Sequence, residues 1–202
     1  MKTLCGLILV CCPAAFAGLS AAAETAAPQT ATAVFAGGCF WCIEADFEKL
    51  DGITAVESGY TGGSLRNPTY QQVSQGGTGH AEAVRVRYDP QRVSYEKLLD
   101  YFWRHIDPTV KDRQFCDIGS QYRSAIFYQN DTEQKLAQSS KQGLEKSGRF
   151  PHIYTEIVAA STFYPAEDYH QDYYKKNPIR YQYYRHSCGR DARVKSVWGD
   201  AH

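Results

Sequence analysis

From residue 32 onward, segments with the hydrophobic pattern of β-strands alternate with segments that have the pattern of α-helices. Short runs rich in β-branched and aromatic residues, several with a period of two, predict strands at 32–36, 52–60, 80–88, 122–128 and 154–160. Apolar residues at helical spacing predict helices over 39–50, 95–106, 131–147 and 166–175, with Ser94 capping the second. The segment from Asn177 is aromatic and basic without a clear period, and we expect it to be irregular.

Strands that alternate with helices predict a two-layer α+β sandwich. Because the connections vary widely in length, we expect a mixed sheet with flanking helices, arranged as a ferredoxin-like plait and followed by a long irregular C-terminal segment. The chain has 202 residues, which suits one domain, and no internal boundary or repeat is visible.

The first residues have the pattern of a secretory signal. Lys2 precedes an apolar stretch over 4–16, and small residues then offer cleavage sites after Ala17 or Ala23. We therefore expect a signal peptide over 1–23, a disordered leader over 24–31, and a folded domain over 32–202. This pattern predicts a protein that is exported to the periplasm and is not stably inserted in the membrane. The alternative is that the apolar stretch is retained as an N-terminal anchor.

Charge and cysteine content narrow the choice of function. Lys and Arg together number 22, as do Asp and Glu, so the chain has no net charge that would attract nucleic acid. We expect the protein to be a monomer. Cleavage of the signal would leave four of the seven cysteines, at positions 39, 42, 116 and 188. Four cysteines in an oxidising compartment could form two structural disulfides, but a bridge across two intervening residues adds little stability and is typical of redox-active pairs.

Cys39 is the strongest candidate for chemistry. It lies between a predicted strand and a predicted helix, where free backbone N–H groups would stabilise a thiolate and lower its pKa. Cys42 follows at helical spacing, and Phe40 and Trp41 beside the sulfur suggest an apolar pocket. This pattern predicts a nucleophilic cysteine used in sulfur redox chemistry.

Three further clusters carry polar candidates. Glu82 stands at the start of an apolar strand, where burial would raise its pKa and allow it to donate a proton; an ordinary exposed glutamate is the alternative. Tyr60 lies in a glycine-rich turn, and Asp117 and Tyr122 lie in the segment 116–124, where each could serve the site or the structure.

Together these motifs resemble the A class of peptide methionine sulfoxide reductases. The resemblance extends from residue 32 to the C-terminus in order and spacing, and it rests on Gly38-Cys39-Phe40-Trp41, Gly59-Tyr60-Thr61-Gly62-Gly63 and Gly79-His80-Ala81-Glu82-Ala83-Val84. It implies reduction of the S epimer of methionine sulfoxide, free or in proteins, through a cysteine sulfenic acid and an intramolecular disulfide. The implied electron donor is thioredoxin-like, and no metal or organic cofactor is expected.

The resemblance also implies roles for individual residues. Cys39 would attack the sulfoxide sulfur, and Glu82 would protonate its oxygen. The oxygen would be held by Tyr60, Asp117 and Tyr122, directly or through water, and the S-methyl group would lie in a cage of Phe40 and Trp41. His80 and Arg123 are expected to brace the site.

The recycling cysteines depart from those of many family members, which have glycine where this chain has Cys42 and carry two cysteines in a glycine-rich tail. Here the tail has Cys188 alone. We expect Cys42 to be the first resolving cysteine and Cys188 a relay or an alternative, although the order could be reversed. Cys116 is expected to be a small buried residue, or otherwise a spare redox cysteine.

Other interpretations also fit parts of the sequence. A periplasmic thioredoxin-type oxidoreductase would share the Cys-x-x-Cys pattern but would not account for Glu82 or Tyr60. A zinc module would need all four cysteines as thiolates. Metal ligation by Glu167, Asp168 and His170 is less favoured than a helix surface packed on the core, and the tyrosine-rich tail is expected to pack over the core rather than stack on nucleic acid.

Overall fold

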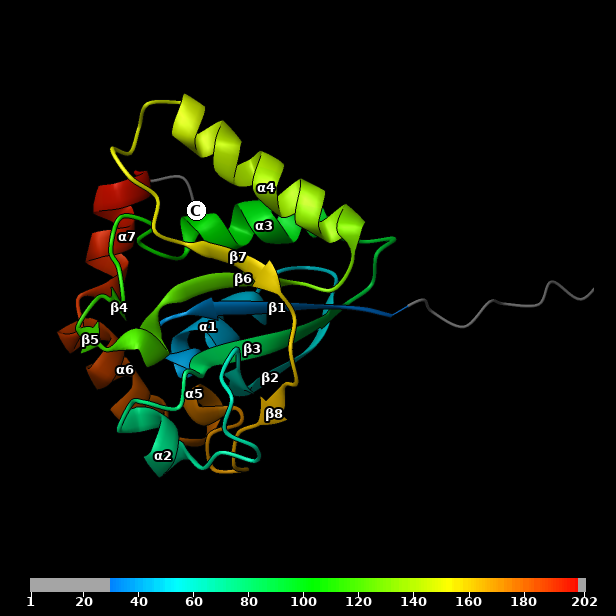
Figure 1. Ribbon diagram of the computed structural model, residues 1–202. Helices are drawn as coiled ribbons and strands as arrows, with labels where there is room; N and C mark the ends of the chain where they lie inside the picture. Colours follow the sequence, from blue (N-terminus) through cyan, green and yellow to red (C-terminus); the bar gives the residue numbers. More distant parts are fainter. Residues whose placement is uncertain (1–29, 200–202) are drawn as a thin grey trace, which may run out of the picture.

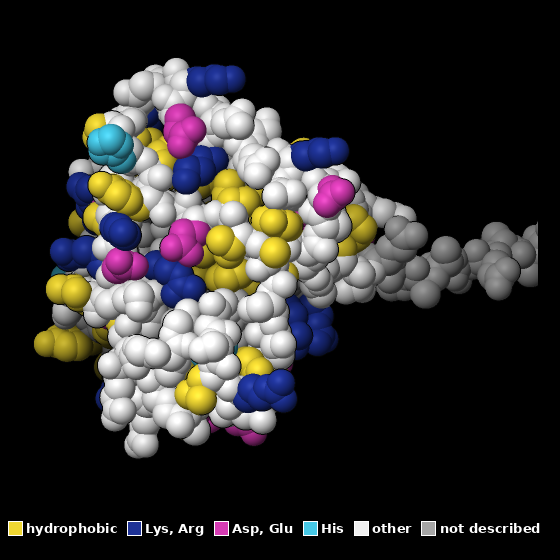
Figure 2. Space-filling view, viewed as in Figure 1, with side chains coloured by type: hydrophobic (Ala, Val, Ile, Leu, Met, Phe, Trp, Pro, Cys, Tyr) yellow, Lys and Arg dark blue, Asp and Glu magenta, His cyan; other side chains and the backbone are white. Residues whose placement is uncertain are grey.

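The computed structural model describes residues 30–199 (Figure 1). The predicted signal peptide and most of the predicted leader lie outside these residues. Between 30 and 199, no helix combines the length and the apolar character that a membrane crossing requires. Oppositely charged side chains are interspersed on the face in Figure 2, with no large region of one sign, as the balanced charge leads one to expect.

One six-stranded sheet, in the order β7-β6-β1-β3-β2-β8, forms the centre of the molecule. β6 and β7 are parallel and the other neighbouring strands are antiparallel, which confirms the predicted mixed sheet. The strands are β1 (Ala31–Gly37), β2 (Ile53–Thr61), β3 (Ala81–Tyr88), β6 (Ser124–Tyr128), β7 (Glu156–Ala159) and β8 (Tyr164–Pro165).

The four inner strands and two helices have the ferredoxin-like arrangement. β1, helix α1 (Phe40–Phe47), β2, β3, helix α3 (Tyr95–Arg104) and β6 follow one another as βαββαβ, and the strands lie in the order β6-β1-β3-β2. The predicted fold class is therefore confirmed. Helix α2 (Tyr70–Ser74), which lies in the β2–β3 connection and was not predicted, begins with a capping box between Thr69 and Gln72.

The main hydrophobic core lies between one face of the sheet and helices α1, α3 and α4 (Asp131–Lys146). The ring of Phe35 on β1 stacks on Phe47 of α1 at 5.1 Å and on Phe102 of α3 at 5.0 Å between centroids. These contacts fix α1, and with it the end of β1 that precedes Cys39, against the sheet. The helical period of α3 was predicted because its apolar residues all face this core.

Small side chains line the opposite face of the sheet. Ala36, Ala81, Ala83 and Ala125 form a second cluster there with Val34 and Phe127, and the coil residue Phe163 packs against it. A side chain at Gly59 would meet the Phe163 ring at 2.4 Å, so this glycine allows the coil to lie directly on β2. The coil thus covers a face that carries no helix of the core.

The C-terminal segment differs from the prediction. It forms helices α5 (Tyr173–Lys176), α6 (Pro178–Ser187) and α7 (Arg190–Trp198), so the expectation of irregular structure is wrong. The predicted helix over 166–175 is wrong except for its last residues, because residues 168–172 are turns, in which the side chains of His170 and Gln171 bond Trp41 and Ser58. Proline at the first position of α6 and Gly189, at φ +68, between α6 and α7 are boundary signals that could have indicated these helices.

The remaining elements lie between α3 and β6. β4 (Arg113–Gln114) and β5 (Asp117–Ile118) pair as a two-stranded ribbon, and a 3-10 turn, Ser120–Tyr122, follows. In Figure 1 this ribbon lies beside α6, so two segments more than sixty residues apart in sequence meet there. The contact between the ribbon and the end of α6 brings Asp117 close to Cys188.

Candidate active site

Cys39 is the last residue before α1, at the turn between β1 and the helix. Its carbonyl oxygen accepts hydrogen bonds from the backbone N–H groups of Cys42 and Ile43 at 3.1 and 3.4 Å. The turn depends on Gly38, which has φ +87 and whose missing side chain would meet Cβ of Gln114 at 2.6 Å. The structure thus places Cys39 at the predicted strand-to-helix turn.

A small cavity of about 70 Å³ opens beside Cys39. It is lined by residues from five separate stretches of the chain, including six of those predicted from sequence. The lining consists of Cys39, Phe40, Trp41, Tyr70, Glu82, Asp117, Tyr122 and Tyr184. Tyr70 and Tyr184 were given no role in the site from the sequence: Tyr70 follows the Asn67-Pro68-Thr69 turn, and Tyr184 is one of several tyrosines in the C-terminal segment.

Glu82 lies deep in this cavity, with its side chain on β3 and only 2% exposed. Its Oε2 accepts a hydrogen bond of 3.0 Å from the backbone N–H of Phe40, the first residue of α1. Burial raises the pKa of Glu82 to about 8, against the lowering effect of that hydrogen bond. The carboxyl group is therefore mostly protonated at neutral pH and can donate a proton into the cavity.

Cys39 and Cys42 are both buried free thiols, 6% and 1% exposed. Burial raises the pKa of Cys39, and its neighbours Cys42 and Glu82 add to the rise, so the predicted lowering by the helix N-terminus is wrong in this state. The pKa of Cys42 is lowered by a hydrogen bond from Cys39, against burial, and Arg190 and Arg185 lower it further. Of the two thiols, Cys42 is therefore the more easily ionised.

Tyr60 lies behind the cavity wall. Its ring packs on Phe40, with 5.8 Å between the centroids, and its hydroxyl donates to Glu167 Oε2 at 2.8 Å. The structure therefore places this predicted oxygen-holding group outside the residues that line the cavity. Glu167 also accepts the backbone N–H of Tyr70 at 2.8 Å, so it ties the two tyrosines together.

His170 supports the wall formed by Trp41. Its Nδ1 accepts a hydrogen bond of 3.0 Å from the Trp41 indole N–H, and the Trp41 ring stacks on Tyr173 at 3.7 Å between centroids. His170 is only 2% exposed and, like Glu167, lies outside any helix, so the expected helix surface is wrong for both. Their contribution to the site could not be read from local sequence.

Asp117 and Tyr184 form a hydrogen-bonded pair at another wall. The Tyr184 hydroxyl donates to Asp117 Oδ2 at 2.6 Å, and it also lowers the pKa of Cys39 through a hydrogen bond to that thiol. Burial raises the pKa of Asp117, against the lowering effects of Tyr184 and Arg190. This pair connects the α6 helix to the reactive cysteine.

His80 and Arg123 brace the loops around the cavity, as predicted. His80 Nδ1 accepts the backbone N–H of Gly63 at 3.1 Å, and its Nε2 lies 2.8 Å from the carbonyl oxygen of Leu65. Arg123 donates to the carbonyl oxygens of Gly79 and Ser120 at 3.1 and 2.8 Å. Both side chains therefore hold backbone segments that adjoin Glu82 and Tyr122.

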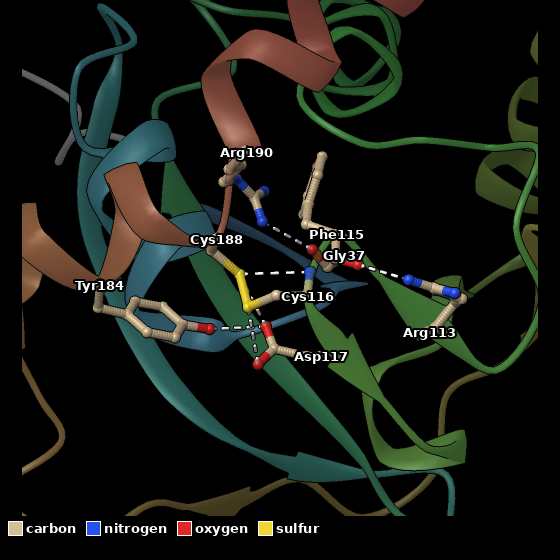
Figure 3. The surroundings of a disulfide bond; sticks show 8 residues. All are labelled: Gly37, Arg113, Phe115, Cys116, Asp117, Tyr184, Cys188 and Arg190. Atoms are coloured by element: carbon tan, nitrogen blue, oxygen red, sulfur yellow. Dashed lines mark hydrogen bonds between the residues drawn. A yellow bond between two sulfur atoms is a disulfide. The ribbon is translucent and has the colours of Figure 1, made fainter.

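A disulfide joins Cys116 to Cys188, with 5.0 Å between the two Cα atoms (Figure 3). The expectation that Cys116 is a buried free residue is wrong, since the residue is exposed. Two of the four cysteines are thus unavailable as thiolates, and the structure does not assemble the zinc module considered above. The pairing could not be deduced from four cysteines alone, which allow three arrangements.

Comparison with known proteins shows the family to which this chain belongs. The family model described as peptide methionine sulfoxide reductase matches residues 31–202. Peptide methionine sulfoxide reductase MsrA of Bacillus licheniformis is 53% identical over 171 residues, which cover 84% of this chain and 94% of the relative. The chain belongs to the peptide methionine sulfoxide reductase family. MsrA 2 of Caulobacter vibrioides is 50% identical over 193 residues, covering 95% of this chain and 98% of that protein.

Solved structures of the reductase family have the same fold. Methionine sulfoxide reductase A of Corynebacterium diphtheriae has a TM-score of 0.68 at 36% identity, covering 76% of this chain and 78% of that one. Reduced Mxr1 of Saccharomyces cerevisiae has a TM-score of 0.70 at 34% identity, covering 74% and 87%. The protein is therefore an oxidoreductase that reduces methionine sulfoxide, and the thioredoxin-type interpretation is not favoured.

Proposed function

We propose that this reductase acts on the S epimer of methionine sulfoxide, free and in proteins, with Cys39 as nucleophile and Glu82 as the acid. The observation that carries the proposal is the buried Glu82 carboxyl group, whose pKa burial raises to about 8, in the cavity that Cys39 lines. A sulfoxide oxygen leaves poorly as a bare oxide, so an acid with a pKa near the working pH lowers the barrier.

In the reductase step, the Cys39 sulfur attacks the sulfoxide sulfur and Glu82 gives its proton to the oxygen. This attack forms a bond between the two sulfurs. The hydroxyl group then moves to the Cys39 sulfur as its bond to the substrate sulfur and the new S–S bond both break, which leaves Cys39 as a sulfenic acid and releases methionine. Cys39 attacks as its thiolate, after its proton has passed to Cys42 or to water. The sulfoxide loses one oxygen and Cys39 gains it, so no other oxidant is needed.

The walls of the cavity suit the substrate. Phe40 and Trp41 offer an apolar surface for the S-methyl group, and Trp41 is held by His170 and Tyr173. Tyr122 and Asp117 face the same cavity as polar partners for the oxygen. For Tyr60, whose hydroxyl bonds Glu167, the proposed contact with the oxygen runs through water or through a shift of that bond.

Recycling follows through a disulfide. Cys42, three residues from the sulfenic acid, condenses with it first, and water leaves; Cys188 then acts as a relay. A thioredoxin-like dithiol protein resets the enzyme. Support for this donor class comes from a yeast relative, since Mxr1 of Saccharomyces cerevisiae has also been solved in complex with Trx2.

We also propose that the protein is exported to the periplasm by its N-terminal signal, functions there as a monomer and repairs oxidised proteins. Support comes from the order of Lys2, the apolar stretch over 4–16 and the small residues after it. Fractionation of cells that express the full chain, with N-terminal sequencing of the mature protein, tests the export and the cleavage after Ala17 or Ala23.

The test of the reaction uses resolved S and R epimers of methionine sulfoxide with dithiothreitol as the only reductant. Wild type should release methionine from the S epimer and leave the R epimer unchanged, and Cys39→Ser should release none. Ser187→Ala, a change outside the cavity, is the matched control and should behave as wild type. Release from the R epimer, or retained turnover in Cys39→Ser, would contradict the proposal.

A further inference from the structure

We propose that the Cys116–Cys188 disulfide is the exit of a two-stage relay, in which oxidation passes from the buried Cys39–Cys42 pair to Cys188 and then to Cys116, where a dithiol protein donor reduces it. This inference rests on the proposed function, because the oxidation that enters the relay is the sulfenic acid formed on Cys39. It assigns a redox role to Cys116, and it makes the disulfide more than a staple for the C-terminal helices.

Burial separates the two pairs. Cys39 and Cys42 are almost completely buried, whereas Cys116 is exposed and Cys188 is half-buried. A protein donor must bring its attacking sulfur into line with the disulfide that it reduces, and access limits the rate of that exchange. A large donor can therefore reach the Cys116–Cys188 bridge, whereas the inner pair lies beneath the cavity walls.

The outer disulfide adjoins the catalytic cavity through Asp117. The two carboxylate oxygens of Asp117 lie 3.8 Å from the Cys116 sulfur and 4.0 Å from the Cys188 sulfur. Asp117 also accepts the Tyr184 hydroxyl, and both residues line the cavity beside Cys39. Figure 3 shows the Tyr184 hydroxyl bonded to Asp117 beside the bridge, so the outer sulfurs adjoin a wall of the cavity that Cys39 lines.

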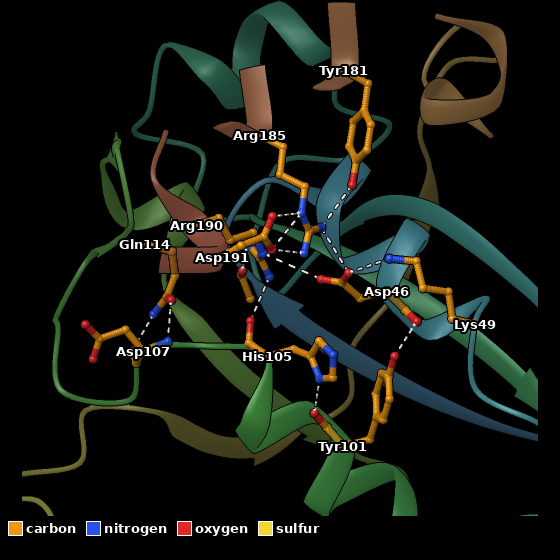
Figure 4. Close-up of polar contacts among 11 residues, drawn as sticks. Asp46, Lys49, Tyr101, His105, Asp107, Gln114, Tyr181, Arg185, Arg190 and Asp191 are labelled. Carbon is orange, nitrogen blue, oxygen red and sulfur yellow. Dashed lines mark hydrogen bonds and ion pairs between the residues drawn. The ribbon is translucent and has the colours of Figure 1, made fainter. Parts of the chain in front are cut away.

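Two arginines hold the Cys188 side of the bridge against the helix that follows Cys39. Arg185 and Arg190 flank Cys188 in sequence, and both pair with Asp46 of α1, at 2.9 and 3.6 Å (Figure 4). Asp46 and Arg190 are each only 2% exposed. Arg190 also donates to the carbonyl oxygen of Gly37, at 3.3 Å. The segment that carries Cys188 is thus anchored to both elements that position Cys39.

The Cys116 side of the bridge is held by the residue before it. Phe115 has φ +52, an unusual conformation for an aromatic residue, and its ring lies 4.4 Å from the guanidinium carbon of Arg190. The backbone N–H of Cys116 points at the Cys188 sulfur at 3.3 Å. Arg190 therefore aligns both outer cysteines, through Phe115 on one side and through the chain next to Cys188 on the other.

The proposed transfer balances without an added reagent. The Cys188 thiolate attacks Cys39 of the Cys39–Cys42 disulfide, forming a Cys39–Cys188 bond and releasing the Cys42 thiolate. The Cys116 thiolate then attacks Cys188, forming the Cys116–Cys188 bond and releasing Cys39, and the two protons of the outer thiols end on the inner pair. Two electrons have moved inward, and the result is the state that the structure displays: an outer disulfide and two inner free thiols.

The direction of the first attack has a physical reason. A disulfide breaks faster when the departing thiol has a low pKa. In the disulfide the hydrogen bond from the Cys39 thiol, the main cause of the lowered Cys42 pKa, is absent. The charges of Arg190 and Arg185 still act to lower the pKa of Cys42, whereas burial and the charge of Glu82 raise that of Cys39. Attack on Cys39 therefore expels the better leaving group, and the same arginines that anchor Cys188 favour that departure.

The test counts methionine released by fully reduced enzyme without any reductant, under anaerobic conditions and with excess methionine S-sulfoxide. Wild type should release about two equivalents per chain, because each pair can hold one disulfide. Cys116→Ser should release about one, since the outer disulfide cannot form. Ile118→Ser, at an exposed position close to Cys116, is the matched control and should match wild type.

Steady-state assays separate a relay from a structural staple. With reduced thioredoxin as donor, Cys116→Ser should lose at least about tenfold in rate, whereas with dithiothreitol, a small dithiol that does not need to dock on the outer disulfide, it should keep most of its rate. After one equivalent of sulfoxide, peptide mapping of wild type should find the Cys116–Cys188 disulfide with Cys39 and Cys42 open to alkylation. A sample without sulfoxide controls for air oxidation.

Each outcome decides a different question. One equivalent from wild type, together with unchanged thioredoxin-supported turnover in Cys116→Ser, would overturn the relay and leave the reductase function intact. A loss of thermal stability without any loss of thioredoxin-supported rate would assign the bridge a structural role only. No methionine from any reduced protein would remove the proposed function itself.

Discussion

Oε2 of Glu82 accepts the backbone N–H of Phe40, the residue that follows the reactive Cys39, at 3.0 Å. This bond ties the acid on β3 to the first turn of α1, so the carboxyl group and the sulfur hold a fixed relationship. It also leaves the other carboxyl oxygen to carry the proton. Burial, rather than a neighbouring charge, is the main reason that this proton stays on Glu82 at neutral pH.

Glu82→Gln should slow the reductase step by about 10²-fold or more, because the amide keeps the shape but is a far weaker acid. Rapid-quench measurement of methionine formed by reduced enzyme in a single turnover tests this. Glu145→Gln on α4, far from the cavity in the fold, is the control and should have the wild-type rate. Iodoacetamide should still alkylate Cys39 in Glu82→Gln, and a wild-type rate in this variant would remove Glu82 from the acid role.

The reductase step should lose rate as pH rises through about 8, the pKa of Glu82. The rate should fall rather than rise because the protonated carboxyl group is the active form of the acid, and this form is present below that pKa. Single-turnover rates between about pH 6 and 10 should show this falling limb in wild type, and Glu82→Gln should lack it. A falling limb that survives in the glutamine variant would have to come from another group.

The free energy of unfolding should also depend on the protonation of Glu82. The folded pKa of Glu82 lies above its value of 4.5 in the unfolded chain, so the folded state binds more protons between 4.5 and about 8 and its stability falls over that range. Glu82→Gln removes this loss. Urea unfolding should therefore find the variant increasingly stable relative to wild type from pH 5 to pH 9; a difference that does not vary with pH would contradict the raised pKa.

Gly38→Ala should destabilise the protein by about 1–3 kcal/mol, because φ +87 disfavours a side chain and the new Cβ would meet the Gln114 side chain at 2.6 Å. Gln114 cannot easily withdraw, since its amide bonds the backbone N–H and the carbonyl of Asp107 at 2.9 and 2.7 Å. Activity should fall as well, because the turn positions Cys39. Urea unfolding and steady-state assays measure the two effects.

The matched control is Gly143→Ala in the interior of α4. An added Cβ there meets nothing within 4 Å, and the position is helical, so the change should stabilise the protein by about 0.5–1 kcal/mol. If both alanine variants had the same stability, steric strain at Gly38 would not be the reason for its glycine.

Asp46→Asn should destabilise the protein by about 3 kcal/mol, because it leaves the buried charge of Arg190 without its partner and weakens the hold on Arg185. Thioredoxin-supported turnover should fall more than single-turnover methionine release, since the arginines anchor Cys188 rather than the substrate cavity. Asp191→Asn is the control: Asp191 pairs with Arg185 from a side chain that is 67% exposed, and its loss should cost less than about 1 kcal/mol.

Much of the fold could be predicted from sequence because its signals are local. The β-prone runs of β1 and β3 and the helical period of α3 are each carried by residues close together in sequence, so each element could be recognised from its own segment. Helix α6 escaped prediction for the opposite reason: among its residues only Tyr181 is buried, and aromatic and basic residues occur all around it. Its stability comes from contacts with α1 and α5 rather than from a hydrophobic stripe.

Residue types at fixed spacing were enough to predict the strand-to-helix turn at Cys39, the place of Glu82 on a strand and the family. The pairing of Cys116 with Cys188 came only from the folded structure, because cysteine pairing depends on which distant loops meet. The folded structure also reversed the expected pKa shift of Cys39: a helix N-terminus acts over a single turn and lowers the pKa, but burial removes water from the whole thiolate and outweighs it. Desolvation and loop contact are properties of the packed chain, and no local pattern records them.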